Sequence, residues 1–286
     1  AAEKMFQNVT LSTVNYDETL IGWSTLLDNE ERIPIDISID FGNSRYSVCG
    51  GGKIARDILI QEYNWTILDG GPEDLYVFDF EENQYEVIKM NDQLWINKNL
   101  KTKYYANGDP IVHAQSTEDW ETAYQQENGA WCYYEDNEGN IDENIVLYNW
   151  YTVNDERGLL TNNQFSIPSE NIFRSLLVAI GGEFINTEGN YENTREILSD
   201  EAWISSYDAS NLTGFSALPV GRRIASGDNS SFTDKIYTFF WANSRLQNSN
   251  NNNPQTMSIG YNCNSVCIQN FSEAFGHSVR LYKNCN

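Results

Sequence analysis

The stretch Ile88-Lys89-Met90-Asn91-Asp92-Gln93-Leu94-Trp95-Ile96 decides the fold of most of the chain. Two short apolar runs flank Asn91-Asp92, and residues of this type favour tight turns. The stretch therefore predicts a β-hairpin. From here to the end, short runs rich in Tyr, Trp and Ile alternate with Gly and Asn, which predicts short strands joined by turns.

Two helices are predicted among these strands. Ser169 is a good N-cap, and the apolar residues that follow it recur at helical spacing until Gly181-Gly182, a typical helix end. The apolar spacing of residues 146–153 predicts a second, short helix. This mixture of strands and helices predicts an α+β fold.

Residues 1–71 have a different pattern. Apolar positions at helical spacing predict one helix over residues 16–27, with Asn15 as its N-cap, and another over residues 54–63. Apolar and polar residues alternate over residues 33–41, which predicts a half-buried strand. We expect a small α/β unit.

The first domain boundary is predicted at Asp69-Gly70-Gly71-Pro72, because Gly and Pro together end regular structure. Residues 72–87 are acidic and irregular, so they are predicted to be a linker that joins a strand. The sequence thus divides into residues 1–71, a linker at 72–87 and a domain at 88–286.

The first segment resembles the closing unit of BspA-type leucine-rich-like surface repeats. The resemblance rests on the stretches 16–23, 42–47, 55–56 and 63–71, in that order. Repeats should precede such a unit, so the resemblance implies a small α/β repeat-cap unit cut from a longer surface or virion protein.

The second segment resembles the Fibrobacter succinogenes major paralogous domain. Five motifs appear in order, at residues 93–102, 104–111, 147–154, 213–223 and 275–280. The resemblance implies a C-type-lectin-like fold, distantly similar to formylglycine-generating enzymes. The chain departs from the family pattern at residues 158–168, which puts any function tied to that stretch in doubt.

Composition excludes several classes of function. The chain has 41 Asp and Glu but 18 Lys and Arg, a net charge of −23, which disfavours nucleic acids and anionic membranes as partners. No apolar run approaches the length of a membrane span, so direct membrane insertion is not expected. With two His, a three-His metal site is also excluded. The five Cys are an odd number, so at least one thiol is unpaired within the chain.

One candidate metal site is an acidic loop. Asp136, Glu138, Asn140 and Asp142 alternate, and oxygen ligands at alternate loop positions are typical of calcium sites. C-type-lectin-like domains often hold structural calcium, so the resemblance supports the site. The alternative, which we favour, is a solvated acidic turn in an acidic chain.

A second candidate is the pair Cys263 and Cys267. Formylglycine-generating enzymes bind copper with two cysteines near this point of the fold, which makes a copper-dependent oxidase the alternative function. The spacing here is one residue shorter, and a soft-metal site would need a further ligand such as His277. The two thiols could equally form a disulfide or stay free.

The C-terminal region is rich in Asn, with nine among residues 241–270. In diversity-generating retroelements, changes at adenines convert Asn codons into codons for Tyr, Ser, His, Asp, Cys, Phe or Leu, and variable proteins display these positions on a C-type-lectin-like fold. The resemblance places such types at several positions here, although Asn-rich sequences also occur in family members that do not vary. The predicted binding face consists of Trp241, Asn243, Ser244, Leu246, Asn248, Tyr261, Cys263, Ser265, Cys267, Phe271 and His277.

The sequence therefore predicts a non-catalytic ligand-binding or adhesin module on a cell or virion surface. Its partner would be a protein or glycan on another cell or particle, and no cofactor would be required beyond an optional structural calcium ion. Residues 243–253 and 261–273 are expected to be largely exposed. Trp241 and Tyr261 could instead be core residues, and a purely structural spacer is a further alternative. We interpret Arg222, Arg223 and Arg280 as structural.

Overall fold

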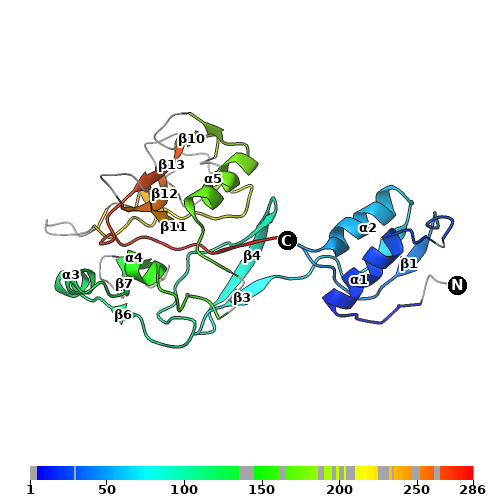
Figure 1. Cartoon of the computed structure of the whole chain (residues 1–286), viewed down its shortest axis with the longest axis horizontal. Coiled ribbons are helices and arrows are strands. Elements are labelled where there is room, and N and C mark those ends of the chain that lie inside the picture. Colours follow the sequence, from blue (N-terminus) through cyan, green and yellow to red (C-terminus); the bar gives the residue numbers. More distant parts are fainter. Residues whose placement is uncertain are drawn as a thin grey trace. The chain divides into compact units, whose positions relative to one another are not determined.

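The computed structural model describes residues 5–28, 30–134, 145–161, 165–185, 190–194, 198–199, 203, 210–224, 232–233, 235–245, 252–260 and 265–285. The chain forms two compact units (Figure 1). The first consists of Ala1–Leu75 together with Asn284–Asn286, and the second of Tyr76–Lys283.

The first unit packs two helices and a small parallel sheet around one apolar core. Its elements are α1 (Thr13–Ser24), β1 (Ser38–Asp40), α2 (Gly51–Gln61) and β2 (Thr66–Leu68), with β1 and β2 paired in parallel. The core consists of Tyr16, Leu20, Ile33, Ile39, Phe41, Ala55, Leu59 and Trp65. The unit is α/β in composition, as its sequence predicts.

Two local predictions for this unit were wrong. The N-cap of α1 is Ser12, whose Oγ accepts a hydrogen bond from the Asn15 backbone N–H at 3.3 Å, so Asn15 lies inside the capped turn. The predicted strand over residues 33–41 is shortened to β1. Asp36 has a φ of +58°, and this left-handed conformation interrupts the extended chain.

A buried carboxylate joins the elements of this unit. Asp69 accepts hydrogen bonds from the Tyr16 hydroxyl and from Nε of Arg56, both at 2.7 Å. The carboxylate is 3% exposed, so the paired guanidinium offsets the cost of burying it. Burial, together with the hydrogen bond and charge of Asp69, raises the pKa of Tyr16 above its ordinary value.

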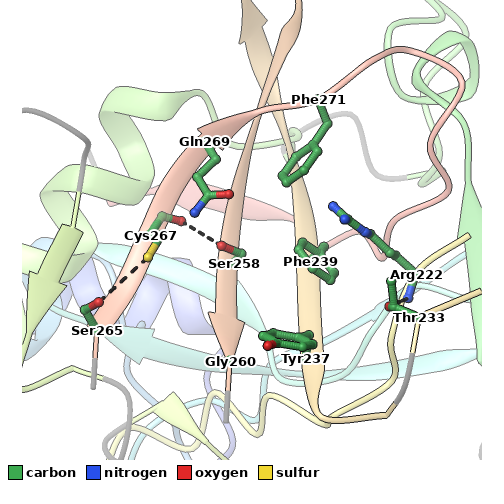
Figure 2. Close-up of a pocket in the computed structure, with 10 residues that line it drawn as sticks. All are labelled: Arg222, Thr233, Tyr237, Phe239, Ser258, Gly260, Ser265, Cys267, Gln269 and Phe271. Atoms are coloured by element: carbon green, nitrogen blue, oxygen red, sulfur yellow. Dashed lines mark hydrogen bonds between the residues drawn. The ribbon is translucent and has the colours of Figure 1, made fainter. Parts of the chain in front are cut away.

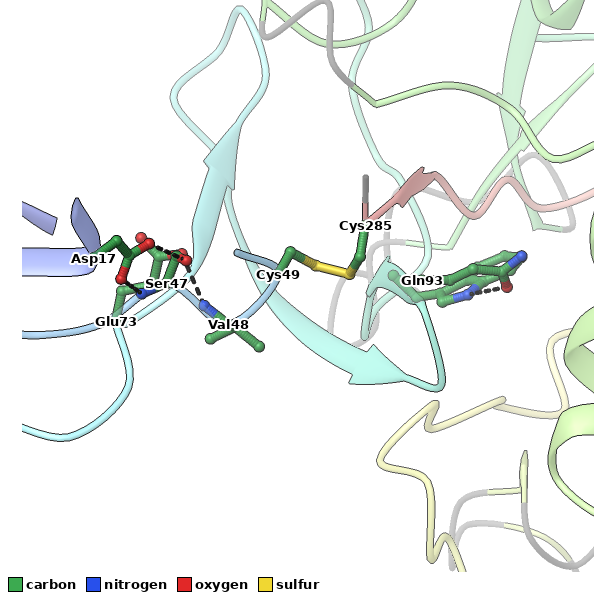
Figure 3. Close-up of a disulfide and its surroundings, with 8 residues drawn as sticks. Asp17, Ser47, Val48, Cys49, Glu73, Gln93 and Cys285 are labelled. Atoms are coloured by element: carbon green, nitrogen blue, oxygen red, sulfur yellow. Dashed lines mark hydrogen bonds between the residues drawn. A yellow bond between two sulfur atoms is a disulfide. The ribbon is translucent and has the colours of Figure 1, made fainter. Parts of the chain in front are cut away.

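A disulfide closes the first unit. It joins Cys49 to Cys285, which lie 236 residues apart in sequence, across a Cα–Cα distance of 4.8 Å (Figure 3). Beside it, the Ser47 hydroxyl binds the carboxylate of Asp17, and the backbone N–H of Val48 donates to Glu73. The bond therefore attaches the C-terminal residues covalently to the first unit. As the odd number of Cys predicts, not every cysteine is in a disulfide: Cys132 and Cys267 are buried and form none within the described part of the chain.

The second unit begins with an antiparallel sheet in the order β14-β5-β4-β3. Its strands are β3 (Tyr76–Phe78), β4 (Gln84–Met90), β5 (Gln93–Ile96) and β14 (Tyr282–Asn284). Met90 pairs with Gln93 across a turn in which Asn91 has a φ of +52°, so the predicted hairpin is confirmed. The acidic stretch that suggests a linker contains β3 and the start of β4.

A three-stranded sheet follows, with two short helices beside it. It contains β6 (Val112–His113), β7 (Ala130–Tyr133) and β8 (Val146–Tyr148), and the helices are α3 (Thr117–Gln125) and α4 (Trp150–Val153). The predicted helix over residues 146–153 was half wrong, because its first three residues form β8. Asn149 ends the strand and caps α4, accepting a hydrogen bond from the Thr152 backbone N–H at 3.0 Å.

The largest sheet has the order β11-β12-β13-β10-β9. Its strands are β9 (Glu183–Phe184), β10 (Asn190–Glu192), β11 (Tyr237–Arg245), β12 (Pro254–Gly260) and β13 (Ser265–Asn270). Helix α5 (Glu170–Ala179) packs against β11 and β12 (Figure 1), and its predicted cap is confirmed because Ser169 Oγ accepts from the Ile172 backbone N–H.

Side chains of β11, β12 and β13 alternate between two faces, as in any strand. One face joins α5 and Trp95 of β5 in the main core. From these three strands, the main core contains Phe240, Ala242, Met257, Ile259, Val266 and Ile268. Together with the helices described above, these sheets confirm the predicted α+β class. Among the described residues, no helix combines the length and apolar composition needed to cross a bilayer.

The structure predicts that the second unit depends on residues ahead of position 83. Asp79 is 3% exposed and accepts a hydrogen bond from the Tyr85 hydroxyl at 2.7 Å. A fragment of residues 83–283 lacks this acceptor and β3, so we expect it to melt at a lower temperature than residues 76–283. An unpaired buried hydroxyl costs about 1–3 kcal/mol.

The matched control is Asp79→Asn in the 76–283 fragment, which keeps β3 and removes the charged acceptor. Calorimetry should place this variant between the two fragments. Equal melting temperatures for residues 76–283 and 83–283 would show that the domain starts after β3.

Candidate ligand-binding site

A pocket of about 350 Å³ lies on the face of the large sheet that α5 does not cover (Figure 2). Strands β11, β12 and β13 form its floor, and residues from the segments before β11 and after β13 also line it. Its lining residues are Arg222, Thr233, Tyr237, Phe239, Ser258, Gly260, Ser265, Cys267, Gln269 and Phe271.

Strand alternation explains why these residues meet. Phe239, Ser258 and Cys267 are direct neighbours across the three strands, since Phe239 pairs with Ser258 and Ser258 with Cys267. Ser258 and Cys267 are flanked on both sides by residues of the main core, and Phe239 is followed by the core residue Phe240. All three therefore point to the opposite face. The core contacts therefore hold the pocket floor in place.

Gly260 makes room for the aromatic side of the pocket. A Cβ atom at this position would lie 2.6 Å from the ring of Tyr237, its cross-strand partner. The missing side chain lets the Tyr237 ring lie against the strand. Further along the floor, the Ser265 hydroxyl lies 3.7 Å from the Cys267 thiol, and the Ser258 hydroxyl donates to the Cys267 carbonyl.

Arg222 supplies a cation to this pocket. Its guanidinium carbon lies 4.3 Å from the ring centre of Phe239, 4.4 Å from that of Phe271 and 4.7 Å from that of Phe275. The backbone is anchored by Thr233, which accepts from the Arg222 N–H and donates to the Arg222 carbonyl. Burial among these groups lowers the pKa of Arg222 to about 10.

Arg222 differs from the two other arginines interpreted as structural. Arg280 is fully buried and donates to Asn99 and to the carbonyls of Ile96, Phe215 and Ser216. Arg223 donates to the Ser116 carbonyl. For Arg222, Nε and Nη1 are buried and have no hydrogen-bond partner among the described residues. The structural interpretation thus fits Arg223 and Arg280, but leaves the charge of Arg222 unexplained.

The other end of this sheet face is closed. His277 and Trp241 are fully buried, with ring centres 4.2 Å apart, and Trp241 donates to the Tyr148 carbonyl at 2.7 Å. Burial, with a further effect from the charge of Arg222, lowers the pKa of His277 well below its ordinary value, so the ring is neutral. Of the two alternatives for Trp241, a core position is therefore the one that the structure supports. His277, also among the predicted binding residues, is buried as well, and neither residue lines the pocket.

The predicted binding residues at the end of β11 lie outside the pocket. Asn243 is exposed, while its backbone N–H donates to the Pro168 carbonyl at 2.7 Å. Ser244 is half-buried, and its hydroxyl accepts from the backbone N–H of Glu170 at the start of α5. Ser244 therefore has a structural contact that sequence reasoning missed.

The expected exposure of residues 261–273 was wrong for residues 265–268, which are buried. The reason is that β13 lies between β12 and β10, so both strand edges are covered. Even so, Ser265, Cys267 and the half-buried Phe271 all line the pocket, and the structure brings these three predicted residues together.

Several other predictions fall outside the described residues. These include the predicted binding residues Leu246, Asn248, Tyr261 and Cys263, and the predicted calcium ligands Asp136, Glu138, Asn140 and Asp142. The candidate calcium loop and the alternative copper pair, which includes Cys263, therefore stay hypotheses from the sequence. Within the described part of the chain, no group of three His, Cys, Asp or Glu residues is arranged to hold a metal ion.

Sequence reasoning missed most of the pocket, including Arg222, Tyr237, Phe239 and Ser258. The signal that could have identified the strand residues is the alternation of side chains between two faces over residues 237–242 and 255–260. No local signal places Arg222 beside them, because it comes from a separate segment.

The chain belongs to the Fibrobacter succinogenes major domain family, whose sequence model matches residues 88–283. This match confirms the resemblance found in the five motifs of the second segment. A search of curated proteins and a search of solved structures each found no match.

The two faces of β13 should respond differently to substitution. Ile268→Ala removes core contacts and should cost roughly 2–5 kcal/mol of unfolding free energy. Cys267→Ala, one residue away, faces the pocket and should cost clearly less, since little surrounding structure has to collapse.

Urea unfolding of the purified variants measures both values. The pair Val266→Ala and Ser265→Ala, on the same strand, serves as a second comparison with the same expected order. Similar losses on both faces would mean that the pocket is packed in solution and that the floor is part of the core.

Proposed function

We propose that the protein is a non-catalytic ligand-binding module of a surface or virion protein, which holds its ligand in the pocket on β11, β12 and β13. The observation that carries the proposal is the lining of this pocket. Ser265, Cys267 and Phe271, three positions of types reachable from Asn codons, share it with the aromatic rings of Tyr237 and Phe239. Aromatic, hydroxyl and amide groups on a rigid base suit the binding of other molecules.

A C-type-lectin-like fold is part of this proposal. Domains of that type bring their first and last strands together, and here β14 lies beside β5. The pairing continues beyond the strands, since Ile96 donates to the Leu281 carbonyl and Leu100 to that of Val279. These contacts support the fold assignment.

The covalent and electrostatic features support an extracellular setting. The Cys49–Cys285 disulfide suits an oxidising compartment. The net charge of −23 disfavours nucleic acid as a partner. The partner we propose is a protein or glycan on another cell or particle, and binding in the pocket requires no cofactor.

A diversity-generating retroelement would give the pocket a further property. Ser265 and Cys267 project from a strand whose other face is fixed in the core, so changes at these positions would alter the pocket while the fold is kept. We propose that these positions vary among copies of the gene. A neighbouring reverse-transcriptase gene with a near-identical template repeat would support this proposal, and its absence would remove it.

Blocking the pocket tests the binding function. Purified protein should bind members of an array of glycans and purified surface proteins, and Ser265→Trp should weaken that binding by about tenfold or more because the indole fills the pocket. The control is Val178→Trp, which adds the same side chain at an exposed position of α5, on the other side of the sheet.

Circular dichroism and melting should show that both variants are folded. Equal binding by the wild type and a folded Ser265→Trp variant would place the binding surface elsewhere. A complete lack of ligands among both classes would favour the structural-spacer alternative.

A further inference from the structure

The pocket contains a positive charge that the described protein groups do not neutralise. Arg222 reaches into the pocket between Phe239 and Phe271 (Figure 2). Its Nε and Nη1 atoms are buried and have no hydrogen-bond partner among the described residues. Arg245, by comparison, donates to the carboxylate of Glu273 at 2.6 Å.

No acidic residue is among the described residues that line the pocket. Burial is the cause of the lowered pKa of Arg222, and no carboxylate of a described residue is among the causes of the shift. The aromatic rings stabilise the cation in part, but they also exclude the water that would otherwise solvate it. An anionic group entering the pocket would gain a charge-assisted hydrogen bond in a site with little competing water.

We propose that the pocket binds a sugar ring that carries a carboxylate, with the carboxylate placed against Arg222. This inference rests on the proposed binding function and names the chemical class of its ligand. Uronic acids and sialic acids share the required chemistry, a carboxylate attached to a pyranose ring.

The dimensions and lining of the pocket favour a sugar over an isolated acidic side chain. A volume of about 350 Å³ is at the small end of ligand pockets, which suits one ring with its substituents. Tyr237 and Phe239, with ring centres 6.1 Å apart, provide apolar surface for the C–H groups of a sugar. The hydroxyls of Ser258 and Ser265 and the exposed amide of Gln269 provide partners for ring hydroxyls.

The net charge of −23 should increase the selectivity for a carboxylate bound at Arg222 over anions bound elsewhere on the surface. Most of the surface repels anions, so a polyanion would not be held by general electrostatic attraction. Binding of a carboxylate therefore depends on the local charge of Arg222. The same reasoning predicts that the neutral counterpart of such a sugar binds more weakly.

Titration calorimetry with small probes tests the ligand class on the full chain. The first arm compares methyl glucuronide with its methyl ester and with methyl glucoside, and the second arm compares a methyl sialoside with its methyl ester. We expect the acid of at least one arm to bind about tenfold or more tightly than its neutral forms. The esters keep the ring and remove the charge, so this comparison does not depend on any variant.

Variants assign the effect to the residue. Arg222→Gln should abolish the preference for the acid, and Arg222→Lys should restore it only in part, because a lysine does not reproduce the planar stacked guanidinium. The control is Arg174→Gln on α5, where the arginine pairs with Glu170 and is not among the pocket residues. This control should keep the preference.

Several results would overturn the inference. Equal binding of acid and ester, or an unchanged preference in a folded Arg222→Gln variant, would contradict the role of Arg222. Binding of succinate or of acetyl-aspartate amide as tight as that of the sugar acid would show that no sugar ring is recognised. If no sugar acid binds but Ser265→Trp still abolishes the binding of another ligand, this inference fails while the proposed function stands.

Discussion

The structure depends on one constraint, the opposite directions of successive side chains in β11, β12 and β13. Met257, Ile259, Val266 and Ile268 point into the main core with Trp95 and α5. The residues between them must then point the other way, and they form the pocket floor. The same hydrogen-bonded strands therefore contribute to the stabilising core with one face and form a candidate binding site with the other.

The pocket face is itself divided into a closed end and an open end. At the closed end, Trp241 packs against both Trp150 and His277, with ring centres 5.6 Å and 4.2 Å away. At the open end, three phenylalanine rings surround Arg222. Burial at the closed end also keeps His277 neutral. Among the described residues that line the pocket, the cation is Arg222. An anionic ligand could pair with this ring-enclosed cation.

The sequence predicted those parts of the fold that local pattern determines. The hairpin at residues 88–96 and the capped helix α5 follow from turn residues, a cap and apolar spacing. The family follows from motifs spread along the second unit.

Predictions failed where contacts between residues distant in sequence decide whether a side chain is buried. The Asn-rich sequence suggested exposure for Ser265, yet β13 is covered on both edges. For Trp241, a binding role and a core position were both open, and its contacts with the Tyr148 carbonyl and His277 belong to a buried core residue. The complete pocket could not be predicted, because no local pattern places Arg222, which comes from a separate segment, beside the strand residues.

The central claim is that one face of β13 is open to small molecules, while the other face belongs to the packed main core. Thiol labelling tests it most directly, because Cys267 lines the pocket and Cys132 lies at 0% exposure in a separate core. In a Cys263→Ser background, with Cys49 and Cys285 in their disulfide, a small methanethiosulfonate should modify Cys267 in the native protein, and Cys132 only on unfolding. Mass spectrometry of the labelled peptides reads out both sites. Labelling of Cys132 as fast as Cys267, or protection of Cys267 until the chain unfolds, would contradict the account.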